Sequence, residues 1–151
     1  MKKVFAILLL FFNIIYVQAQ CAIDYNYIPI GVNYGLSTDT LATGTVGQMY
    51  DEDITFFLPT DTVDNGLYVT FVDFHIISIS LPLGMTWECN NTIANCHYDP
   101  SITQYGCVNI SGTPLISGSY NVDVNLIATH SLSSIAGTEN ISFSLPLTIY
   151  P

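Results

Sequence analysis

Short runs in which apolar and polar residues alternate one by one constrain the fold of this chain more than any other feature. The clearest run extends from Tyr120 to Ala128, where apolar residues occupy every second position and Asn121, Asp123 and Asn125 lie between them. Successive side chains of a β-strand point to opposite faces, so this run predicts a strand with one buried and one solvated face. After residue 19, no stretch of helical length shows an apolar period of about 3.6 residues. The sequence therefore predicts an all-β chain.

Similar runs recur between segments rich in Gly, Pro, Asn and Ser. We expect strands over 52–58, 68–80, 85–89, 107–112, 120–128 and 140–150, with 68–80 forming one long strand or two short ones. The positions expected to face a core outside the run 120–128 are Ile54, Phe56, Leu58, Met85, Trp87, Cys89, Val108, Ile110, Ile141, Phe143, Leu145, Leu147 and Ile149. A pattern of about seven or eight short strands separated by turns is typical of an antiparallel β-sandwich.

Three features mark turns and edges in this pattern. Segment 59–67 is a turn-rich connection in which Asn65-Gly66 supplies the positive φ angles of a tight turn. Gly112 and Gly118 bracket a second turn, where side chains would be awkward. Pro146 has no backbone N–H to donate, so it predicts an edge position or a bulge in the last strand.

The first residues have the composition of a secretory signal peptide. Lys2 and Lys3 precede an apolar run from Val4 to Val17, and Ala19 ends the motif that a signal peptidase reads. We predict that residues 1–19 are removed on export and that residues 20–151 form a single domain, with no membrane insertion afterwards. The protein is then secreted or held at the cell surface.

The charge of the remaining chain excludes several partners. Both basic residues lie in the predicted signal peptide, whereas all 12 acidic residues follow it. Nucleic acid and anionic lipid surfaces are bound through basic groups, so we exclude both as partners. The acids must be solvated, hydrogen-bonded or neutralised by metal ions, and the simplest interpretation is a solvated acidic surface.

Four cysteines remain after the signal peptide, namely Cys21, Cys89, Cys96 and Cys107. An even number in an exported chain predicts two disulfides, and the sequence leaves all three pairings open. Cys89, Cys96, His97 and Cys107 could instead suggest a zinc site. They lack the closely paired spacing of structural zinc sites, so disulfides are the preferred interpretation and no metal site is predicted here.

Two segments together resemble the signature of the immunoglobulin-like, cadherin-like domains of bacterial surface proteins. They are "SLPLGMTW" (80–87) and "ISGTPLISGSYNVDVNLIAT" (110–129). The matching residues are Leu81, Pro82, Gly84 and Met85 in the first, Ile110, Ser111, Gly112, Thr113, Pro114, Gly118 and Tyr120 in the second, and Gly47 and Tyr50 further upstream. The resemblance covers about residues 41–129 and includes cysteine-bearing modules near the N-terminus of secreted Bacteroidetes proteins. It implies an immunoglobulin-like sandwich at the cell surface.

Candidate modification sites follow from the same resemblance. Asp39-Thr40-Leu41 and Asp61-Thr62-Val63 look like the O-glycosylation motif of the Bacteroidetes. Both fall in turn-rich segments that we expect to be exposed. Thr40 and Thr62 are therefore the residues expected to carry a glycan.

Sequence signals of catalysis are scarce. No nucleophile elbow, zinc-protease, phosphate-loop or dinucleotide-binding motif is present. His75, His97 and His130 lie far apart in the sequence and in different predicted elements. We predict that the protein is not an enzyme, has no catalytic residue and needs no cofactor.

The acids Asp51 and Asp53 raise the question of a weak calcium site. Two residues apart on the outward face of one strand, they are separated by about 7 Å, and Asp123 also faces outward on its own strand. Two carboxylates with backbone oxygens could begin a calcium site of the extracellular kind. The alternative, which we prefer, is that they are solvated charges that protect a sheet edge.

The sequence thus predicts a secreted, non-enzymatic immunoglobulin-like module with a structural or adhesive role and a protein or glycan partner at the cell surface. In this hypothesis the loop between Cys89 and Cys107 presents Trp87, His97, Tyr98 and Tyr105, although it could equally cover the end of the core. The alternative is a carbohydrate-binding accessory module of an exported polysaccharide-degrading system. That function requires a coplanar, exposed strip of tyrosines drawn from Tyr25, Tyr27, Tyr34, Tyr98 and Tyr105.

Overall fold

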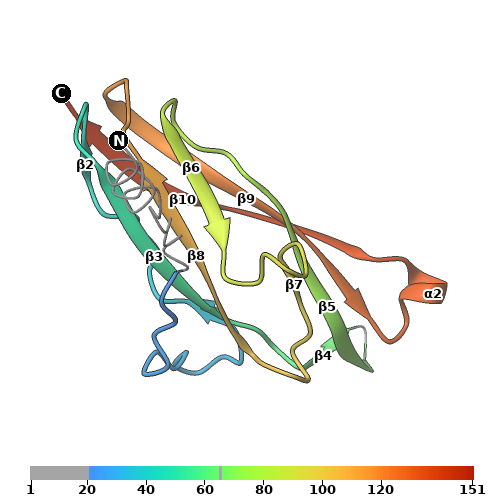
Figure 1. The fold of residues 1–151 in the computed structure, drawn as a ribbon. Coiled ribbons are helices and arrows are strands. Elements are labelled where there is room, and N and C mark those ends of the chain that lie inside the picture. Colours follow the sequence, from blue (N-terminus) through green and yellow to red (C-terminus); the bar gives the residue numbers. More distant parts are fainter. Residues whose placement is uncertain (1–20, 65) are drawn as a thin grey trace, which may run out of the picture.

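The computed structural model describes residues 21–64 and 66–151, and the predicted signal peptide lies outside this part of the chain (Figure 1). Its strands are β1 (Gly35–Leu36), β2 (Gly44–Thr45), β3 (Tyr50–Phe57), β4 (Asp61–Asp64), β5 (Leu67–Ile79), β6 (Met85–Cys89), β7 (His97–Tyr98), β8 (Tyr105–Gly112), β9 (Gly118–His130) and β10 (Glu139–Tyr150). One short helix, α2 (Ser133–Ala136), joins β9 to β10. Among the described residues, no helix is long and apolar enough to cross a membrane.

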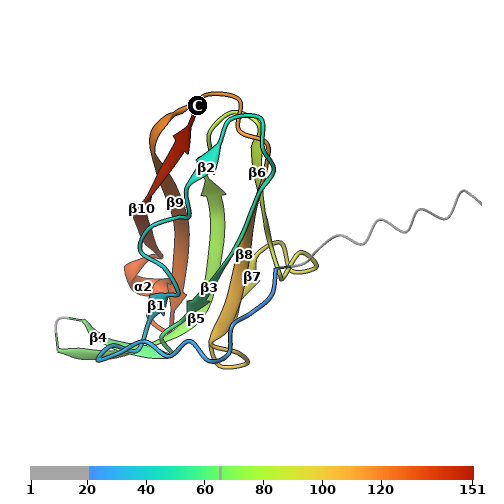
Figure 2. The ribbon, with the colours of Figure 1, turned by 90° about the vertical axis from the view of Figure 1, so that its left-hand side faces the viewer.

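The strands form two sheets that face each other (Figure 2). The first has the order β1-β3-β8-β6, and the second has the order β2-β10-β9-β5-β4, with β7 also paired to β5. Long neighbouring strands are antiparallel, and only the two-residue pairing of β2 with β10 is parallel. This order, with one edge strand divided between the sheets, is that of the immunoglobulin fold. The predicted fold class, an antiparallel immunoglobulin-like β-sandwich, is confirmed.

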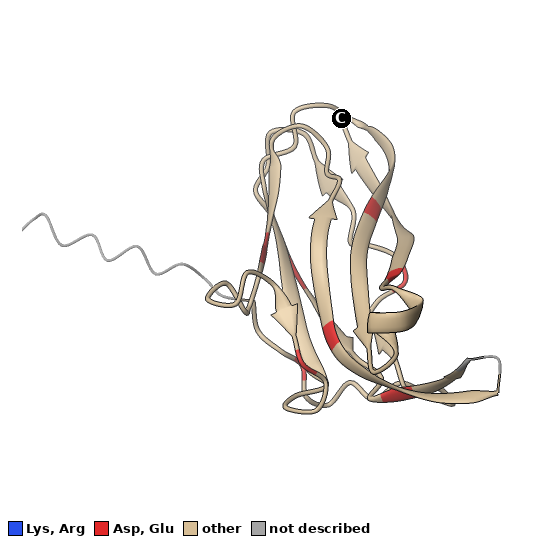
Figure 3. Ribbon diagram, turned by 90° about the vertical axis from the view of Figure 1, so that its right-hand side faces the viewer, with Lys and Arg blue, Asp and Glu red and all other residues tan. Residues whose placement is uncertain are grey.

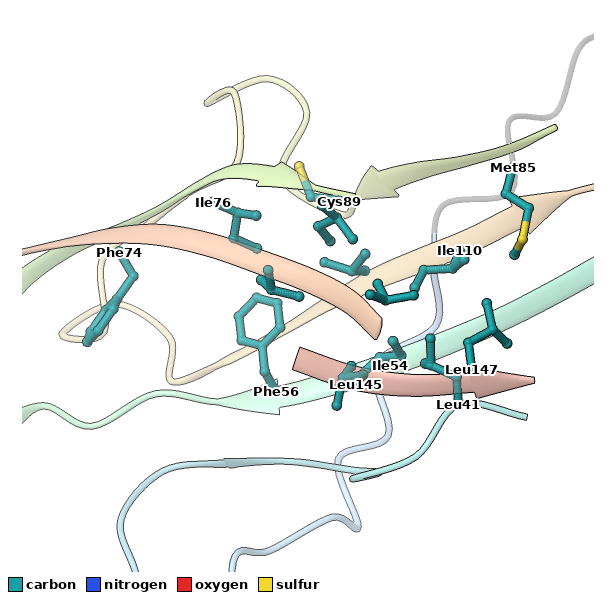
Figure 4. Close-up of a cluster of buried hydrophobic side chains, with 14 of the residues drawn as sticks. Leu41, Ile54, Phe56, Phe74, Ile76, Met85, Cys89, Ile110, Leu145 and Leu147 are labelled. Carbon is teal, nitrogen blue, oxygen red and sulfur yellow. The ribbon is translucent and has the colours of Figure 1, made fainter. Parts of the chain in front are cut away.

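The predicted inward positions meet between the sheets (Figure 4). Ile54 and Phe56 of β3 and Ile110 of β8 belong to one buried cluster with Leu145 and Leu147 of β10. Burial of each such side chain contributes about 1.5–3 kcal/mol. This cluster therefore provides the main driving force that holds the two sheets together.

The alternation in 120–128 also predicts the faces of β9 correctly. Val122, Val124 and Ala128 are buried, whereas the intervening polar residues are exposed. Trp87 and Leu58 differ from the expectation, because they are only partly buried and pack against the margin of the core.

The structure refines two of the predicted segments. Residues 68–80 correspond to one long strand, β5, whose pairing with β9 shifts register at two places. Segment 59–67 is more regular than the predicted connection, because β4 pairs with the start of β5 as a hairpin. Gly66 in its turn has a φ of 81°, as expected, whereas Asn65 lies outside the described residues.

Pro146 occupies an edge position, as predicted. The pairing of β10 with β9 runs without a bulge from Glu139 to Ile149. On the opposite side of β10, the Pro146 carbonyl accepts a hydrogen bond from the Leu41 N–H at 2.9 Å. The N–H that proline lacks would therefore have faced away from β9, so the ladder loses nothing.

The chain between β1 and β2 crosses from one sheet to the other. β1 pairs with the end of β3, whereas β2 pairs with the end of β10. Glu52 fixes the crossing, because its carboxylate accepts hydrogen bonds from the Ala42 N–H at 3.0 Å and from the Tyr50 hydroxyl. Leu41 is buried at the same place.

Two disulfides complete the fold, and no cysteine of the described chain is free. Cys21 pairs with Cys107 across 86 residues, and Cys89 pairs with Cys96 across 7. The zinc alternative is therefore excluded, because every thiol is oxidised. Two structural disulfides are typical of an oxidising compartment.

Candidate functional site

The two sheets separate at one end of the sandwich and enclose an apolar cavity of about 1060 Å³. Its buried lining residues include Ile54 and Ile110 of the first sheet and Leu145 of the second. β1, β4 and the residues that follow α2 line it as well, and Figure 2 shows these elements at the same end of the molecule. Ligand-binding cavities are commonly of about this size and composition. We call this region the open-end cleft.

The cleft exists because the two sheets have strands of unequal length. β5, β9 and β10 contain 13, 13 and 12 residues, whereas β3, β6 and β8 contain 8, 5 and 8. The second sheet therefore extends past the first. Accordingly, Leu147 and Ile149 of β10 are buried, while Ile141 and Phe143, which line the cleft, remain partly exposed.

Large apolar side chains lie exposed at the mouth of the cleft. Val63 of β4 is 68% exposed, and Tyr34 and Leu67 are exposed beside it; all three line the cavity. A continuous apolar region that joins a cavity to its rim is typical of a binding surface, whereas single exposed apolar residues are ordinary.

Two acids, Asp61 of β4 and Glu139 of β10, also line the mouth. A hydrogen bond to the Asp61 carboxylate raises the pKa of the Tyr68 phenol. Figure 3 shows acidic residues on several strands and no basic residue in the described chain. The cleft is thus an apolar cavity with a negatively charged rim and no internal counter-charge from Lys or Arg.

Asp51 and Asp53, the acids considered for a weak calcium site, lie elsewhere, on the outer face of the first sheet. The Asn109 side-chain amide donates to Asp51 at 2.6 Å and to Asp53 at 2.9 Å, and the Ala22 N–H donates to the second oxygen of Asp53 at 2.9 Å. In the described part of the chain, no group of three or more His, Cys, Asp or Glu residues could hold a metal ion. Asp53 therefore fastens the N-terminal segment to the sheet, beside the Cys21–Cys107 disulfide, while Asp51 is held by Asn109.

The loop between Cys89 and Cys107 is packed down more than the sequence suggested. Its first half is closed by the Cys89–Cys96 disulfide, while Cys107 belongs to the other bridge. Tyr98, one of the residues expected to be presented, is only 3% exposed, contacts Phe56 edge to face, and donates its hydroxyl to Asn90 at 2.8 Å. For Tyr98, covering the core is the correct interpretation. The exposed apolar residue of the disulfide loop is instead Ile93.

Two of the three histidines lie together, contrary to the expectation from their separation in the sequence. β5 and β7 pair His75 with His97, and the rings stack with centroids 3.7 Å apart. His97 Nδ1 lies 2.7 Å from an oxygen of Asp73. In the described structure no serine hydroxyl is hydrogen-bonded to either ring, so this group lacks the nucleophile of a triad.

The tyrosines required for a sugar-binding strip do not share a plane. Tyr98 is buried, and Tyr105 is partly buried with its hydroxyl donating to the Tyr27 carbonyl at 3.0 Å. The rings of Tyr25 and Tyr105 meet edge to face, at an interplanar angle of 65°. Tyr34 is exposed at the open-end cleft rather than beside them. The feature that would favour a carbohydrate-binding module is thus missing from this set.

Both candidate glycosylation sites are accessible. Thr40 is exposed just before the buried Leu41, and Thr62 is exposed in β4, where it lies at the rim of the cleft. Their modification stays a prediction.

Sequence reasoning did not find the open-end cleft. The alternation along 140–150 marks Ile141 and Phe143 as inward residues in the same way as Leu145 and Leu147. The one signal that could have indicated the cleft is length, because the predicted strands 68–80 and 140–150 are longer than the strands expected to face them.

Comparisons with known proteins identify no family. No family model matches the chain, and no curated protein matches it. Among solved structures, it is similar to a PapD-like (ASH) domain of human CEP192, with 10% identity, a TM-score of 0.44, and coverage of 89% of this chain and 96% of that one. It is also similar to the VesB protease of Vibrio cholerae, with 11% identity, a TM-score of 0.43, and coverage of 77% of this chain and 32% of that one.

Proposed function

We propose that this protein is an exported, non-enzymatic immunoglobulin-like module with a structural or adhesive role at the cell surface, and that it binds its partner at the open-end cleft. The observation that carries the proposal is the continuity of the apolar cavity with the exposed side chains of Tyr34, Val63 and Leu67. A solvent-exposed apolar surface of this kind is costly unless a partner covers it. The signal-like N-terminus, the disulfides and the resemblance to bacterial surface domains support export.

The remaining features favour a binding role over catalysis. The only histidine–carboxylate pair in the described chain joins His97 of β7 to Asp73 of β5, and neither residue lines the cleft. The lining side chains are mostly apolar, which suits recognition by burial rather than proton transfer.

Adhesion of cells that display the protein tests this function. Val63→Gln replaces an apolar side chain at the exposed rim without adding a charge, and Ile93→Gln makes the same change at a fully exposed position of the Cys89–Cys96 loop. Both positions are solvent-exposed, so both variants should remain folded. We expect Val63→Gln to reduce attachment about tenfold, because it removes an apolar contact of the proposed binding surface, and Ile93→Gln to leave it unchanged.

Protease treatment of intact cells is the control for location, because it should remove the protein only if the protein is displayed on the outside. If instead only the change at Ile93 reduced attachment, the binding surface would be the disulfide loop rather than the cleft. Equal attachment by wild type, both variants and cells without the protein would refute an adhesive role.

A further inference from the structure

Strand β10 leaves part of one edge without a partner. One side pairs with β9 along its length, from Glu139 to Ile149. On the other side, β2 reaches only Ile149 and Tyr150, and the Leu41 N–H bonds to Pro146. In the described chain no backbone partner pairs with residues 139–145 on that side. Residues 41–46 cover this edge beside Pro146 to Tyr150. The preceding strand β1 pairs with β3 in the other sheet, so this chain does not cover residues 139–145.

The free backbone groups can be identified from the alternation of a strand. The carbonyls of Pro146 and Tyr150 are hydrogen-bonded on the open side, so even-numbered residues face it. Asn140, Ser142 and Ser144 therefore present their N–H and C=O groups at the open edge. No hydrogen bond from these three backbone N–H groups occurs within the described residues.

The side chains next to this edge line the cleft. Ile141, Phe143 and Leu145, which alternate with the three free residues, all line the apolar cavity. An occupant that satisfies both features must offer backbone donors and acceptors at strand spacing and an apolar side chain at every second residue. An extended polypeptide does both, whereas a helix or a lipid chain leaves the edge unpaired.

The charge of the rim indicates the character of that polypeptide. Asp61 and Glu139 flank the mouth, and residues 21–151 contain no Lys or Arg. A second copy of this domain would bring more acids to the same place and no compensating base. The complementary partner is a chain that carries Lys or Arg next to an alternating apolar segment.

We propose that the partner of the open-end cleft donates an extended segment that adds to the free edge of β10 between Asn140 and Ser144, with alternate apolar side chains in the cavity and a basic residue beside Asp61 and Glu139. This inference rests on the proposed function, because it names the class of partner for the same cleft.

Amide hydrogen exchange on the purified, disulfide-bonded protein tests the edge directly. The probes are two synthetic peptides of alternating valine and serine, with two lysines at the N-terminal end in one and at the C-terminal end in the other. We expect one of them to slow exchange at Asn140, Ser142 and Ser144 by about tenfold or more at saturation. The amides of Ile141 and Phe143 face β9 and serve as controls that are protected with or without peptide.

A matched pair of variants separates edge pairing from simple burial. Ser142→Pro removes a donor on the open side only, as Pro146 already does in this strand, whereas Ser142→Ala keeps the donor. We expect the proline variant to bind the peptide about tenfold more weakly and the alanine variant to bind within about twofold of wild type. Exchanging the peptide lysines for glutamates should also weaken binding by about tenfold.

A second measurement leaves the protein unchanged. Methylation of every second peptide amide in one phase should abolish binding, and methylation in the other phase should not, because only one edge of the added strand meets β10. Equal binding by both methylated peptides would overturn the inference. The inference would also be overturned if the peptide changed amide exchange at Ile141 and Phe143 but did not protect Asn140, Ser142 and Ser144. In that case the cleft would still be a binding site.

Two further results would also overturn the inference. One is binding by neither peptide, in which case the adhesion test above decides the proposed function separately. The other is a dimer of this protein that Ser142→Pro dissociates, because the segment would then come from a second copy rather than from a basic partner.

Discussion

At the residue scale, two glycines show how closely the turn segments around Gly84 and Gly112 fit together. A Cβ at Gly84 would lie 2.1 Å from the Thr113 carbonyl oxygen, and a Cβ at Gly112 would lie 2.4 Å from the Gly84 oxygen. The Thr113 N–H donates to the Gly84 carbonyl at 2.9 Å. The two segments on which the family resemblance rests are therefore in direct backbone contact. Around Gly118 a Cβ would meet only ordinary contacts at 3.5 Å, but its φ of 159° is one that side chains rarely adopt, as predicted.

Gly84→Ala should therefore destabilise the fold more than an ordinary glycine substitution. Gly84 has a φ of 93° and a backbone atom in the place of a Cβ, whereas Gly47 has a φ of 74° and nothing within 4 Å. We expect Gly84→Ala to lower the free energy of unfolding by about 2 kcal/mol or more, and Gly47→Ala by about 1 kcal/mol. Urea titration measures both. Equal losses would show that the Thr113 backbone moves aside without penalty.

Buried tyrosines make the fold sensitive to alkali. Burial raises the pKa of Tyr98 from 10.0 to about 12, and burial with a hydrogen bond to Glu52 also raises the pKa of Tyr50. The folded protein holds these protons more tightly than the unfolded chain does. Their contribution to stability is therefore complete below pH 10 and is lost as the pH rises through about 12.

Tyr98→Phe isolates one of these two contributions. At neutral pH it should cost about 1 kcal/mol, for the lost hydrogen bond to Asn90. Its free energy of unfolding should then fall less steeply than that of wild type between pH 10 and 12. Parallel curves over this range, measured by urea titration at fixed ionic strength, would contradict the assignment to Tyr98.

At the element scale, the N-terminal segment matters more than its short strands suggest. β1 and β2 have two residues each, yet the segment before them is tied to the first sheet by the Cys21–Cys107 disulfide and by hydrogen bonds to Asp53 and Thr55. Thr55 points outward by alternation but is buried, because this segment covers it. The same chain crosses from β3 to β10 and contacts the β10 backbone only from Pro146 onward, which leaves the edge of residues 139–145 free in the described chain.

The two disulfides should therefore contribute unequally. In the chain-entropy account, a loop of 86 residues gives roughly 4–5 kcal/mol, whereas a loop of 7 residues gives roughly 2 kcal/mol. We expect Cys21→Ala with Cys107→Ala to lower the free energy of unfolding about twice as much as Cys89→Ala with Cys96→Ala. Peptide mapping without reduction confirms the pairing beforehand. A larger loss for the short loop would mean that local packing around Cys89, not loop entropy, dominates.

At the scale of the whole molecule, charge is the least balanced property. All 12 acidic residues lie in the chain after residue 19, which has no Lys or Arg (Figure 3). Repulsion among these charges lowers the free energy of unfolding. At 0.1 M, salt largely screens the repulsion between exposed charges that lie more than about 10 Å apart. The exposed acids therefore help to keep the chain dissolved at the expense of its compact state.

Salt should stabilise the protein without a specific ion. We expect NaCl from about 20 to about 300 mM to raise the melting temperature by a few degrees. Because Asn109 and the Ala22 N–H already use oxygens of Asp51 and Asp53, calcium at about 1 mM should add nothing beyond NaCl of equal ionic strength. A rise of a few degrees that a chelator reverses would instead place a calcium site among these acids.

The sequence by itself determined the sandwich and its faces. Alternation fixes which residues of 120–128 and 140–150 point inward, because the side-chain period of a strand is two. Gly66 and Pro146 were predicted correctly for a similarly local reason, since each depends on the backbone chemistry of a single residue. The two disulfides were expected from the number of cysteines, whereas their pairing was not.

Tertiary structure alone decided the pairing and the site. His75 meets His97 through the pairing of β5 with β7, and Cys21 meets Cys107 because the N-terminal segment lies along β3. No local sequence pattern encodes either contact. The open-end cleft depends on a difference in length between two facing sheets and on where the N-terminal strand changes sheets. Both are relations between elements, so Ile141 and Leu145 carry the same sequence signal although only one of them is fully covered.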